Sequence, residues 1–218
     1  MRECRRSNER AQRRVRFPPT MSFKSISKLP FARKLLRLLA QWRVQEKLGH
    51  LLPHLPPSSS VLDVGAGNCV LLNELRKRNY RVIGLDIDNL SLLENVHPVI
   101  YAGGRLPFGD RCFDVTLLIT VLHHIPQPEA TLAEARRVSG RIVVMEEIYS
   151  NALEKHLTHF VDSVFNCEFR GHPHSNKTDA GWRAVFKQLG LRIISAQYSC
   201  SLGVLKRATY VLESPLGL

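Results

Sequence analysis

Two hydrophobic periods alternate along the middle of the chain. Between residues 60 and 148, apolar runs of strand length are separated by segments in which apolar residues recur every three or four positions. The first pattern is typical of strands buried on both faces, and the second of amphipathic helices. The alternation predicts strands at residues 60–65, 80–87, 97–102, 112–120 and 140–148, with helices at residues 69–79, 89–96 and 127–139.

The C-terminal part breaks this rhythm. Residues 178–190 have helical spacing and end at Gly190, and two strand patterns follow at residues 191–199 and 204–213. So short a link permits an antiparallel pair but not a parallel crossover. The whole pattern predicts an α/β fold of three layers, Rossmann-like, with a seven-stranded, mostly parallel sheet, an antiparallel last strand and helices on both faces. We assign this domain to residues 58–218, with residues 150–177 as a variable lid or acceptor-side segment.

A basic amphipathic helix is expected within residues 21–57. Its apolar residues at near-helical spacing are Leu35, Leu38, Leu39, Trp42 and Leu48, with Arg33, Lys34, Arg37 and Arg43 between them. Three interpretations remain open: a helix that caps the domain, a contact with an anionic membrane surface or a protein partner, and a mitochondrial targeting segment. Residues 1–20 are rich in Arg and lack an apolar period, so disorder is expected there, and Met21 is an alternative start.

The net charge of +12 is unevenly distributed. Residues 1–60 carry 14 Lys and Arg against 3 Asp and Glu, whereas residues 61–218 carry 17 against 16. The folded body is therefore nearly neutral, which argues against nucleic-acid binding by the core. No apolar run is long enough for a transmembrane helix. The five scattered cysteines indicate free thiols in a reducing compartment, so a cytoplasmic protein is expected, with a membrane-associated or mitochondrial one as the alternative.

A glycine-rich turn, VLDVGAGNC, follows the first predicted strand. A dinucleotide-binding loop would carry Gly or Ala where this chain has Val70, so that fingerprint fails at its third element. The other signature is an acid two residues before a G-x-G turn, which Asp63, Gly65 and Gly67 supply. Asp86 ends the second strand, nineteen residues after Gly67, where a carboxylate can accept hydrogen bonds from both hydroxyls of a ribose.

At these residues the chain resembles the class I S-adenosylmethionine-dependent methyltransferases. The stretch LPFGDRCFDVTLLITVLHHIP, residues 106–126, is similar to the type 11 subgroup in its LPF, acid, FD, apolar strand and LHH order. The resemblance covers residues 60–150 and leaves the first sixty uncovered. It implies an enzyme that uses S-adenosyl-L-methionine to methylate an acceptor, for which a small molecule is favoured. A monomer or weak dimer is expected.

The resemblance also implies roles for individual residues. Asp63 and the Gly65–Gly67 loop would approach the methionine part of the cofactor, Asp86 the ribose and Ile87 the adenine. The family's adenine-binding acid is replaced by Ala102, so backbone groups of Arg105 and Leu106 are expected there. Thr120 would face the ligand or the acceptor. The implied cofactor-binding set is Asp63, Gly65, Ala66, Gly67, Asp86, Ile87, Arg105, Leu106 and Thr120.

Acid–base candidates follow the fourth and fifth strands. His123 and His124 are candidate catalytic bases, against the alternative that one of them packs at a helix start. Glu146 and Glu147 are neighbours on a strand, so at most one is expected to point inward. Four histidines in residues 150–177 lack a metal-ligand framework, and no metal site is expected.

Two other functions stay open beside the small-molecule methyltransferase. The first is a protein or nucleic-acid methyltransferase that docks through its basic N-terminal segment. The second is a catalytically silent module that binds the cofactor, suggested by Ala102 and by Cys69 in the glycine-rich loop.

Overall fold

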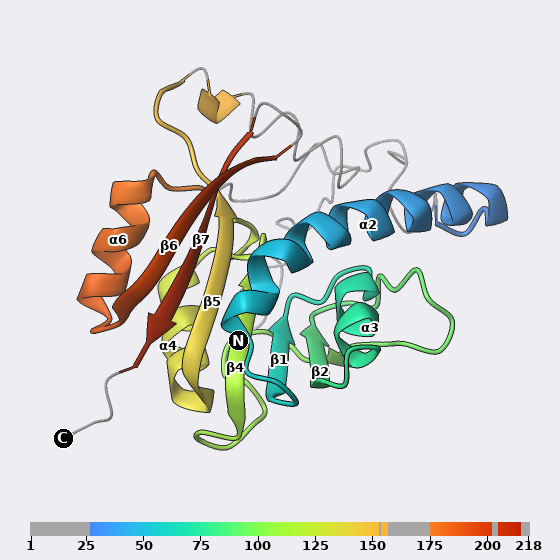
Figure 1. Ribbon diagram of the computed structural model, residues 1–218, viewed down its shortest axis with the longest axis horizontal. Coiled ribbons are helices and arrows are strands. Elements are labelled where there is room, and N and C mark those ends of the chain that lie inside the picture. The colour runs from blue at the N-terminus through green and yellow to red at the C-terminus, as the bar shows by residue number, and fades with distance from the viewer. Residues whose placement is uncertain (1–26, 153, 157–174, 202–204, 215–218) are drawn as a thin grey trace, which may run out of the picture.

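A seven-stranded sheet forms the centre of the molecule in the computed structural model, which describes residues 27–152, 154–156, 175–201 and 205–214. The strand order is β3-β2-β1-β4-β5-β7-β6 (Figure 1). The strands are β1 (Ser60–Val64), β2 (Arg81–Asp86), β3 (Val99–Ile100), β4 (Phe113–Ile119), β5 (Ser139–Glu147), β6 (Arg192–Ser201) and β7 (Leu205–Glu213). The first five pair in parallel, and β7 is antiparallel to both β5 and β6. The predicted mostly parallel sheet with a reversed last strand is confirmed, and the reversed strand lies between β5 and β6.

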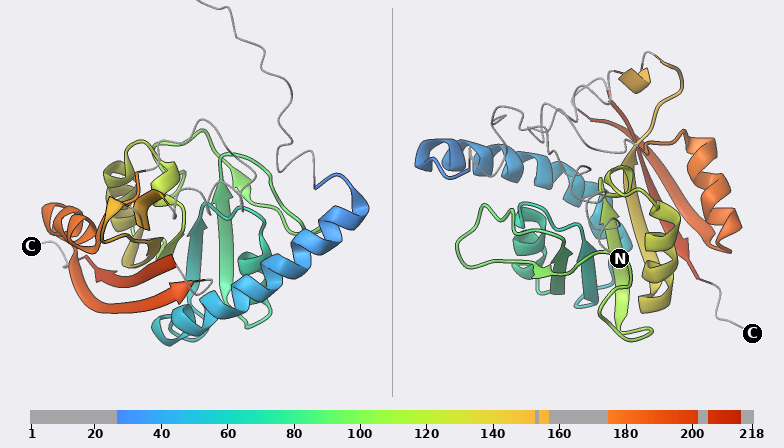
Figure 2. Two further views of the ribbon diagram at one scale, coloured as in Figure 1. Left: turned by 90° about the horizontal axis from the view of Figure 1, so that it is seen from above. Right: turned by 180° about the vertical axis from the view of Figure 1, so that it is seen from behind.

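Helices cover both faces of the sheet and create two apolar cores. The helices are α2 (Pro30–Leu51), α3 (Val70–Arg76), α4 (Pro128–Val138) and α6 (Asp179–Gln188), with the short 3-10 helices η1 (Leu52–His54) and η2 (Leu122–His124). One core joins α2 and α3 to the sheet, and the other joins α4 and α6 to its opposite face. Figure 2 shows α2 and α4 on opposite sides of the strands.

Strand alternation decides which side chains enter each core. On β1, Val61 packs on the α2 side and Leu62 on the α4 side, as successive residues of a strand must. The same rule sends Glu147 to the α2 side and Glu146 to the α4 side of β5. Both are nonetheless buried, at 6% and 0% exposure, so the expectation that only one would point inward is wrong. Each glutamate has polar partners on its own face of the sheet: Glu147 pairs with Arg207, and Glu146 contacts His123.

The helix predicted for residues 89–96 is absent, and this prediction is wrong. Side chains in this segment bond the local backbone: Asn89 accepts from the Ser91 amide, and the Ser91 hydroxyl accepts from the Leu93 amide and donates to the Val96 carbonyl. Such Asn and Ser bonds compete with helical hydrogen bonds. Leu92 and Leu93 are buried all the same, so the apolar spacing that resembled a helix reflects a packed loop.

Helix α2 packs through a different stripe from the predicted one. Its buried residues are Ala40, Val44, Leu48 and Leu51. Of the five apolar residues expected on the packed side, only Leu48 is buried, and the other four are exposed. The helix caps one face of the domain, as the first interpretation held, but with its less apolar side. In the part of the chain described, no helix combines the length and hydropathy that a membrane crossing requires.

Several expectations concern residues outside the described ranges. Residues 1–20, for which disorder is expected, lie outside these ranges. So does most of the variable segment 150–177, with His159, His172 and His174. His156 is described and is exposed.

Two leucines of α2 test which side of the helix stabilises the fold. Leu48 is 2% exposed and Leu38 is 55% exposed. Leu48→Ala should lower the free energy of unfolding by about 2–4 kcal/mol, because it leaves a cavity between α2 and the sheet. The matched change Leu38→Ala should lower it by less than about 0.5 kcal/mol. Urea unfolding of the two variants measures both values, and equal losses would contradict the packed stripe described above.

Candidate functional site

The glycine-rich loop follows β1 at the carboxyl end of the sheet. Gly65 and Gly67 have φ of 78° and 49°. A Cβ on Gly65 would lie 2.3 Å from Val121 Cγ2, whereas a Cβ on Gly67 would meet only the Gly65 carbonyl oxygen, at 3.9 Å. The amides of Gly65 and Ala66 both donate to the Leu85 carbonyl. The loop is therefore tied to the end of β2 and stays open beside Gly67.

Asp86 joins this loop to the tip of β2. Its Oδ2 accepts from the Gly67 amide at 2.7 Å, and its Oδ1 accepts from the Ile87 amide at 2.7 Å. A carboxylate has about four acceptor positions, so Asp86 retains capacity for ligand hydroxyls. The neighbouring Ile87 side chain is 68% exposed and offers an apolar surface to a flat ring. Loop, carboxylate and exposed Ile87 together fit the nucleoside part of the implied cofactor.

Cys69 occupies the N-cap position of α3 with a left-handed backbone, at φ 60°. The side chain is fully buried, and burial raises the pKa of the thiol to about 11. It therefore remains a protonated thiol near neutral pH and lies beneath the loop. Asn68, one position before the N-cap, accepts from the Val70 amide at 3.1 Å through its side-chain oxygen.

Asp63 is buried below the loop, at 2% exposure. Burial raises the pKa of its carboxyl to about 7, while the nearby Lys47 charge acts in the opposite direction. Its Oδ2 has no hydrogen-bond partner among the residues that the structure describes. The loop amides of Gly65 and Ala66 donate to the Leu85 carbonyl, so binding these amides is not the reason for a buried carboxylate at Asp63. A buried carboxylate oxygen in this state is suited to accept from a cationic or hydrogen-bonding ligand group.

Lys47 reaches the site from the last turns of α2 and was not predicted from the sequence. Its Nζ lies 3.1 Å from Thr120 Oγ1, directly after β4. Burial and the charge of Arg43 lower the pKa of Lys47 to about 8, while Glu147 raises it. Lys47 lies on the packed side of α2, three residues after Val44 and four before Leu51, which are both buried. A lysine at a core-facing helical position is unusual, and this is how the sequence could have indicated a functional residue here.

Thr120 itself has a strained backbone. Its φ is 53°, which is rare for a β-branched residue. The amide donates to the Met145 carbonyl at 2.7 Å, so β5 holds the turn in place. The structure thus places Thr120 at the carboxyl edge, beside Lys47, as its predicted position at a strand tip implied.

A fully buried guanidinium connects α2 to the same edge. Arg207 of β7 pairs with Glu46 Oε1 at 2.9 Å and with Glu147 Oε1 at 3.6 Å. Glu46 directly precedes Lys47 on α2, so this pairing also fixes the position of the lysine. A single charged network on the α2 side of the sheet therefore involves α2, β5 and β7.

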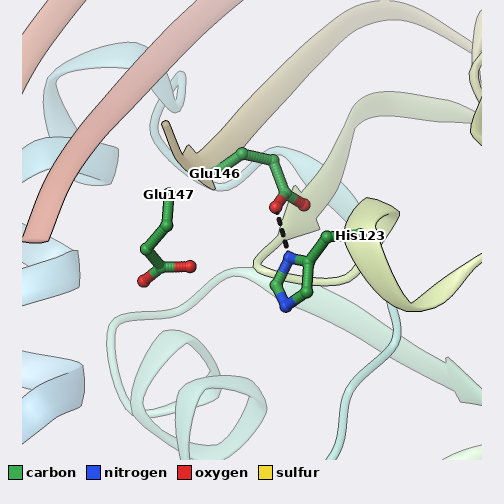
Figure 3. Close-up of side chains that lie close together, drawn as sticks. All are labelled: His123, Glu146 and Glu147. Atoms are coloured by element: carbon green, nitrogen blue, oxygen red, sulfur yellow. Dashed lines mark hydrogen bonds and ion pairs between the residues drawn. The ribbon is translucent and has the colours of Figure 1, made fainter. Parts of the chain in front are cut away.

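A second polar cluster lies on the α4 side (Figure 3). His123 Nδ1 lies 2.6 Å from Glu146 Oε2, and both side chains are buried. The other oxygen of Glu146 accepts from the amides of Val121 and Leu122 at 2.9 and 2.7 Å. The His124 ring lies 4.0 Å from that of His123. The Glu146 carboxylate thus orients the ring of the candidate base His123.

Ligand atoms of His123, Glu146 and Glu147 lie within 4.8 Å of one another, a spacing that could hold a metal ion. The oxygens are already engaged, however. Glu146 takes two amides and His123, and Glu147 faces the Arg207 guanidinium. These contacts favour a network of hydrogen bonds and charges over a cation site.

The expected adenine edge is more open than the rest of the site. Ala102 and Arg105 are exposed, and added side chains at Gly103 and Gly104 would meet nothing within 4 Å. The backbone of Leu106 is committed elsewhere. Its amide donates to Glu134 Oε2 at 2.8 Å, and its carbonyl accepts from Arg137 Nη2 at 3.0 Å. In this arrangement the Leu106 backbone holds the loop on α4.

Comparison with known proteins shows which family and fold this chain is similar to. Residues 62–143 match the family model described as a methyltransferase domain. The match covers 62–143 of the 218 residues, and the sheet around it shares the Rossmann-like class I fold of S-adenosylmethionine-dependent methyltransferases.

Individual proteins similar to this chain point the same way. An uncharacterized methyltransferase from Mycobacterium sp. (strain JLS) is 29% identical over 142 residues, which are 58% of this chain and 56% of that protein. The chain thus spans about half the length of the curated relatives it matches.

Two solved structures share the fold. The magnesium protoporphyrin IX methyltransferase of Synechocystis PCC 6803, with bound S-adenosylhomocysteine, has a TM-score of 0.55 and 18% identity over 85% of this chain and 89% of that one. A chain from a Haloferax volcanii complex between the Trm112 methyltransferase activator and a methyltransferase has a TM-score of 0.63 and 16% identity, covering 82% and 94%.

The buried Asp63 predicts a pH dependence of stability. Its pKa in the folded state is about 7 against an ordinary value of 3.8, so the unfolded state loses this proton at lower pH. The stabilising effect is complete below the ordinary pKa and is lost as pH rises towards about 7. Asp63→Asn cannot ionise and should escape this loss.

Between about pH 5 and pH 7, the free energy of unfolding of the wild type should therefore fall by about 2 kcal/mol relative to Asp63→Asn. Thermal unfolding of both proteins across this range measures the difference. Parallel curves for the two proteins would mean that Asp63 ionises normally in the folded state.

Proposed function

We propose that this chain is an S-adenosylmethionine-dependent methyltransferase whose acceptor is a small molecule. The observation that carries the proposal is the contact between the Asp86 carboxylate and the Gly67 amide at the carboxyl ends of β1 and β2. It brings a strand-tip acid against an open glycine turn, which is where open α/β sheets bind their ligands. The methyltransferase domain match over residues 62–143 supports the same ligand class.

The residues around this contact suit the parts of the cofactor. Asp86 would accept from the ribose hydroxyls, and Ile87 would pack on the adenine. The Gly65–Gly67 loop, with Ala66 between its glycines, would follow the methionine part. Asp63 would lie near the amino group, since a cation there would favour the ionised carboxylate. Arg105 would contact the adenine at the open edge of the site. The Leu106 amide would bind the adenine only if it gave up its hydrogen bond to Glu134.

S-adenosylmethionine, when bound, supplies an electrophilic methyl group on a sulfonium. The chain then has to hold the acceptor in line, exclude water and receive a proton if the acceptor atom carries one. Thr120 and Lys47, which contact each other at the tip of β4, would orient the acceptor. His123, with Nδ1 fixed by Glu146, is the candidate to receive a proton, as a carboxylate-oriented imidazole can. His124, whose ring lies 4.0 Å from that of His123, is the second candidate.

The small-molecule acceptor is favoured over a macromolecule by the charge of the folded body. Residues 61–218 are nearly neutral, as expected for a site that does not grip a nucleic-acid backbone. The Synechocystis neighbour is named for a small-molecule acceptor. A protein acceptor or a protein activator remains the second candidate, since the Haloferax neighbour belongs to a complex with an activator protein.

Cofactor binding can be tested on a pair of matched acid variants. Asp86→Asn should weaken binding of S-adenosylmethionine and S-adenosylhomocysteine by tenfold or more, about 1.5–3 kcal/mol for a charged hydrogen-bond acceptor. Asp88→Asn removes the same charge two residues away and should leave affinity nearly unchanged. Isothermal titration calorimetry measures both. Absence of binding by the wild type, or equal affinity in all three proteins, would contradict the proposal.

The acceptor class is then identified by transfer of labelled methyl groups into cell extracts separated into lipid, small-molecule, protein and RNA fractions. Label in the small-molecule or lipid fraction supports the proposal when Asp86→Asn abolishes it. Label in the protein or RNA fraction would favour the second candidate. Cofactor binding without any labelled acceptor would favour a silent binding module.

A further inference from the structure

The outer face of α2 is an exposed apolar surface, formed by Phe31, Leu35, Leu38, Leu39 and Trp42. These side chains are between 47% and 83% exposed. Phe31, Leu35, Leu38 and Trp42 follow the i, i+4, i+7, i+11 spacing, so they form one stripe along the helix. The stripe lies opposite the buried residues Ala40, Val44, Leu48 and Leu51. The helix is thus apolar on two sides, and one of them packs on the described part of the domain.

Positive charge accompanies the outer face, and no acid interrupts it. Lys34 and Arg37 are both exposed; Lys34 borders the stripe, four residues before Leu38, whereas Arg37 lies seven residues before Val44, on the other side of the helix. Residues 21–45 contain six Lys and Arg and neither Asp nor Glu. The first acid of α2 is Glu46, which is held by Arg207 at the other end of the helix. The charge that borders the outer face is therefore entirely positive.

Among the elements that the structure describes, α2 lies with this face outward. The helix packs through its C-terminal half on α3 and the sheet, while its N-terminal half reaches past α3 (Figure 1). In the view from above, α2 is the outermost helix on its side of the sheet (Figure 2). The fold thus holds a basic, apolar helix face at its periphery.

We infer that the outer face of α2 docks onto an anionic membrane surface, with the helix parallel to the bilayer. A helix that combines a large apolar stripe with flanking Lys and Arg lies in the headgroup region, where its apolar side chains enter the acyl boundary and its cations meet anionic lipids. Nucleic acid would use the cations but leave the apolar stripe in water. A second copy would bring two positive faces together, which charge repulsion opposes.

This docking would also orient the candidate site. Lys47, on the same helix, contacts Thr120 at the carboxyl edge of the sheet. Because α2 is one continuous helix from Pro30 to Leu51, a membrane bound along its outer face has a defined position relative to that edge.

Tryptophan fluorescence offers a local readout in the full chain. The protein has two tryptophans: Trp42 is 60% exposed on the outer face, and Trp182 is fully buried. With vesicles of equal parts phosphatidylcholine and phosphatidylglycerol, emission should shift to shorter wavelength as Trp42 enters the bilayer. Phosphatidylcholine alone should produce little shift, and added salt should weaken the binding. The shift should be absent in Trp42→Phe.

Paired variants separate the two contributions. Lys34→Gln with Arg37→Gln should weaken binding to anionic vesicles about 25-fold, as measured by sedimentation. Each charge contributes about 1 kcal/mol at an anionic surface, and 1.4 kcal/mol corresponds to a tenfold change in affinity. Lys187→Gln with Arg81→Gln, distant from α2, is the matched control and should bind as the wild type does. Phe31→Ser with Leu38→Ser should abolish binding. These side chains are exposed, and unchanged circular dichroism would verify that each variant folds.

Three results would overturn the inference: no binding to anionic vesicles, equal binding to phosphatidylcholine alone, or an equal loss in the control pair. Analytical ultracentrifugation without lipid tests the second copy as occupant. Self-association that Phe31→Ser with Leu38→Ser abolishes would assign the face to a dimer instead. If the wild type bound an RNA oligonucleotide but not vesicles, and the serine variant still bound the RNA, the basic residues would be assigned to nucleic-acid binding.

Discussion

The pairing of Arg207 with Glu46 and Glu147 determines where α2 lies, and much of the site depends on that position. A guanidinium without solvent exposure is unfavourable unless charged partners surround it, so the two carboxylates have to come from elements that meet at Arg207. Glu147 belongs to the adjacent strand β5, and Glu46 is brought by α2. Once Glu46 is fixed, its neighbour Lys47 reaches Thr120, and the opposite side of the helix is turned outward.

Strand alternation distributes the remaining polar groups between the two faces of the sheet. Asp63 and Glu147 lie on the α2 side, where they face Lys47 and Arg207. Glu146 lies on the α4 side and orients His123. Adjacent residues of β5 thus serve two separate polar clusters, one built on charge pairs and one on a carboxylate–imidazole bond. Both clusters lie at the carboxyl edge, where the proposed cofactor would bind.

Two non-glycine residues with a left-handed backbone, Cys69 and Thr120, lie at the same edge. Positive φ occurs at Gly65, Gly67, Cys69 and Thr120, all in the turns after β1 and β4. Glycine adopts this backbone readily, whereas Cys69 and Thr120 do so at an energetic cost that surrounding contacts must offset. The Met145 carbonyl holds the Thr120 turn, and complete burial holds Cys69. The cysteine that replaces a glycine in the loop is thereby accommodated beneath it.

Much of this protein was already determined by its sequence, because the deciding signals are local. Apolar runs predicted the strands, the short link before Leu205 predicted the reversed β7, and Asp63, Gly65, Gly67 and Asp86 marked the loop and the acid that the structure brings together. Tertiary structure decided what depends on partners distant in sequence. Spacing at residues 89–96 indicated a helix that side-chain bonds replace by a loop, and both sides of α2 are apolar, so periodicity could not show which one packs. Lys47 and Arg207 became part of the site only through burial beside charged partners. A sequence pattern shows that these residues are charged, but it does not show which residues surround them.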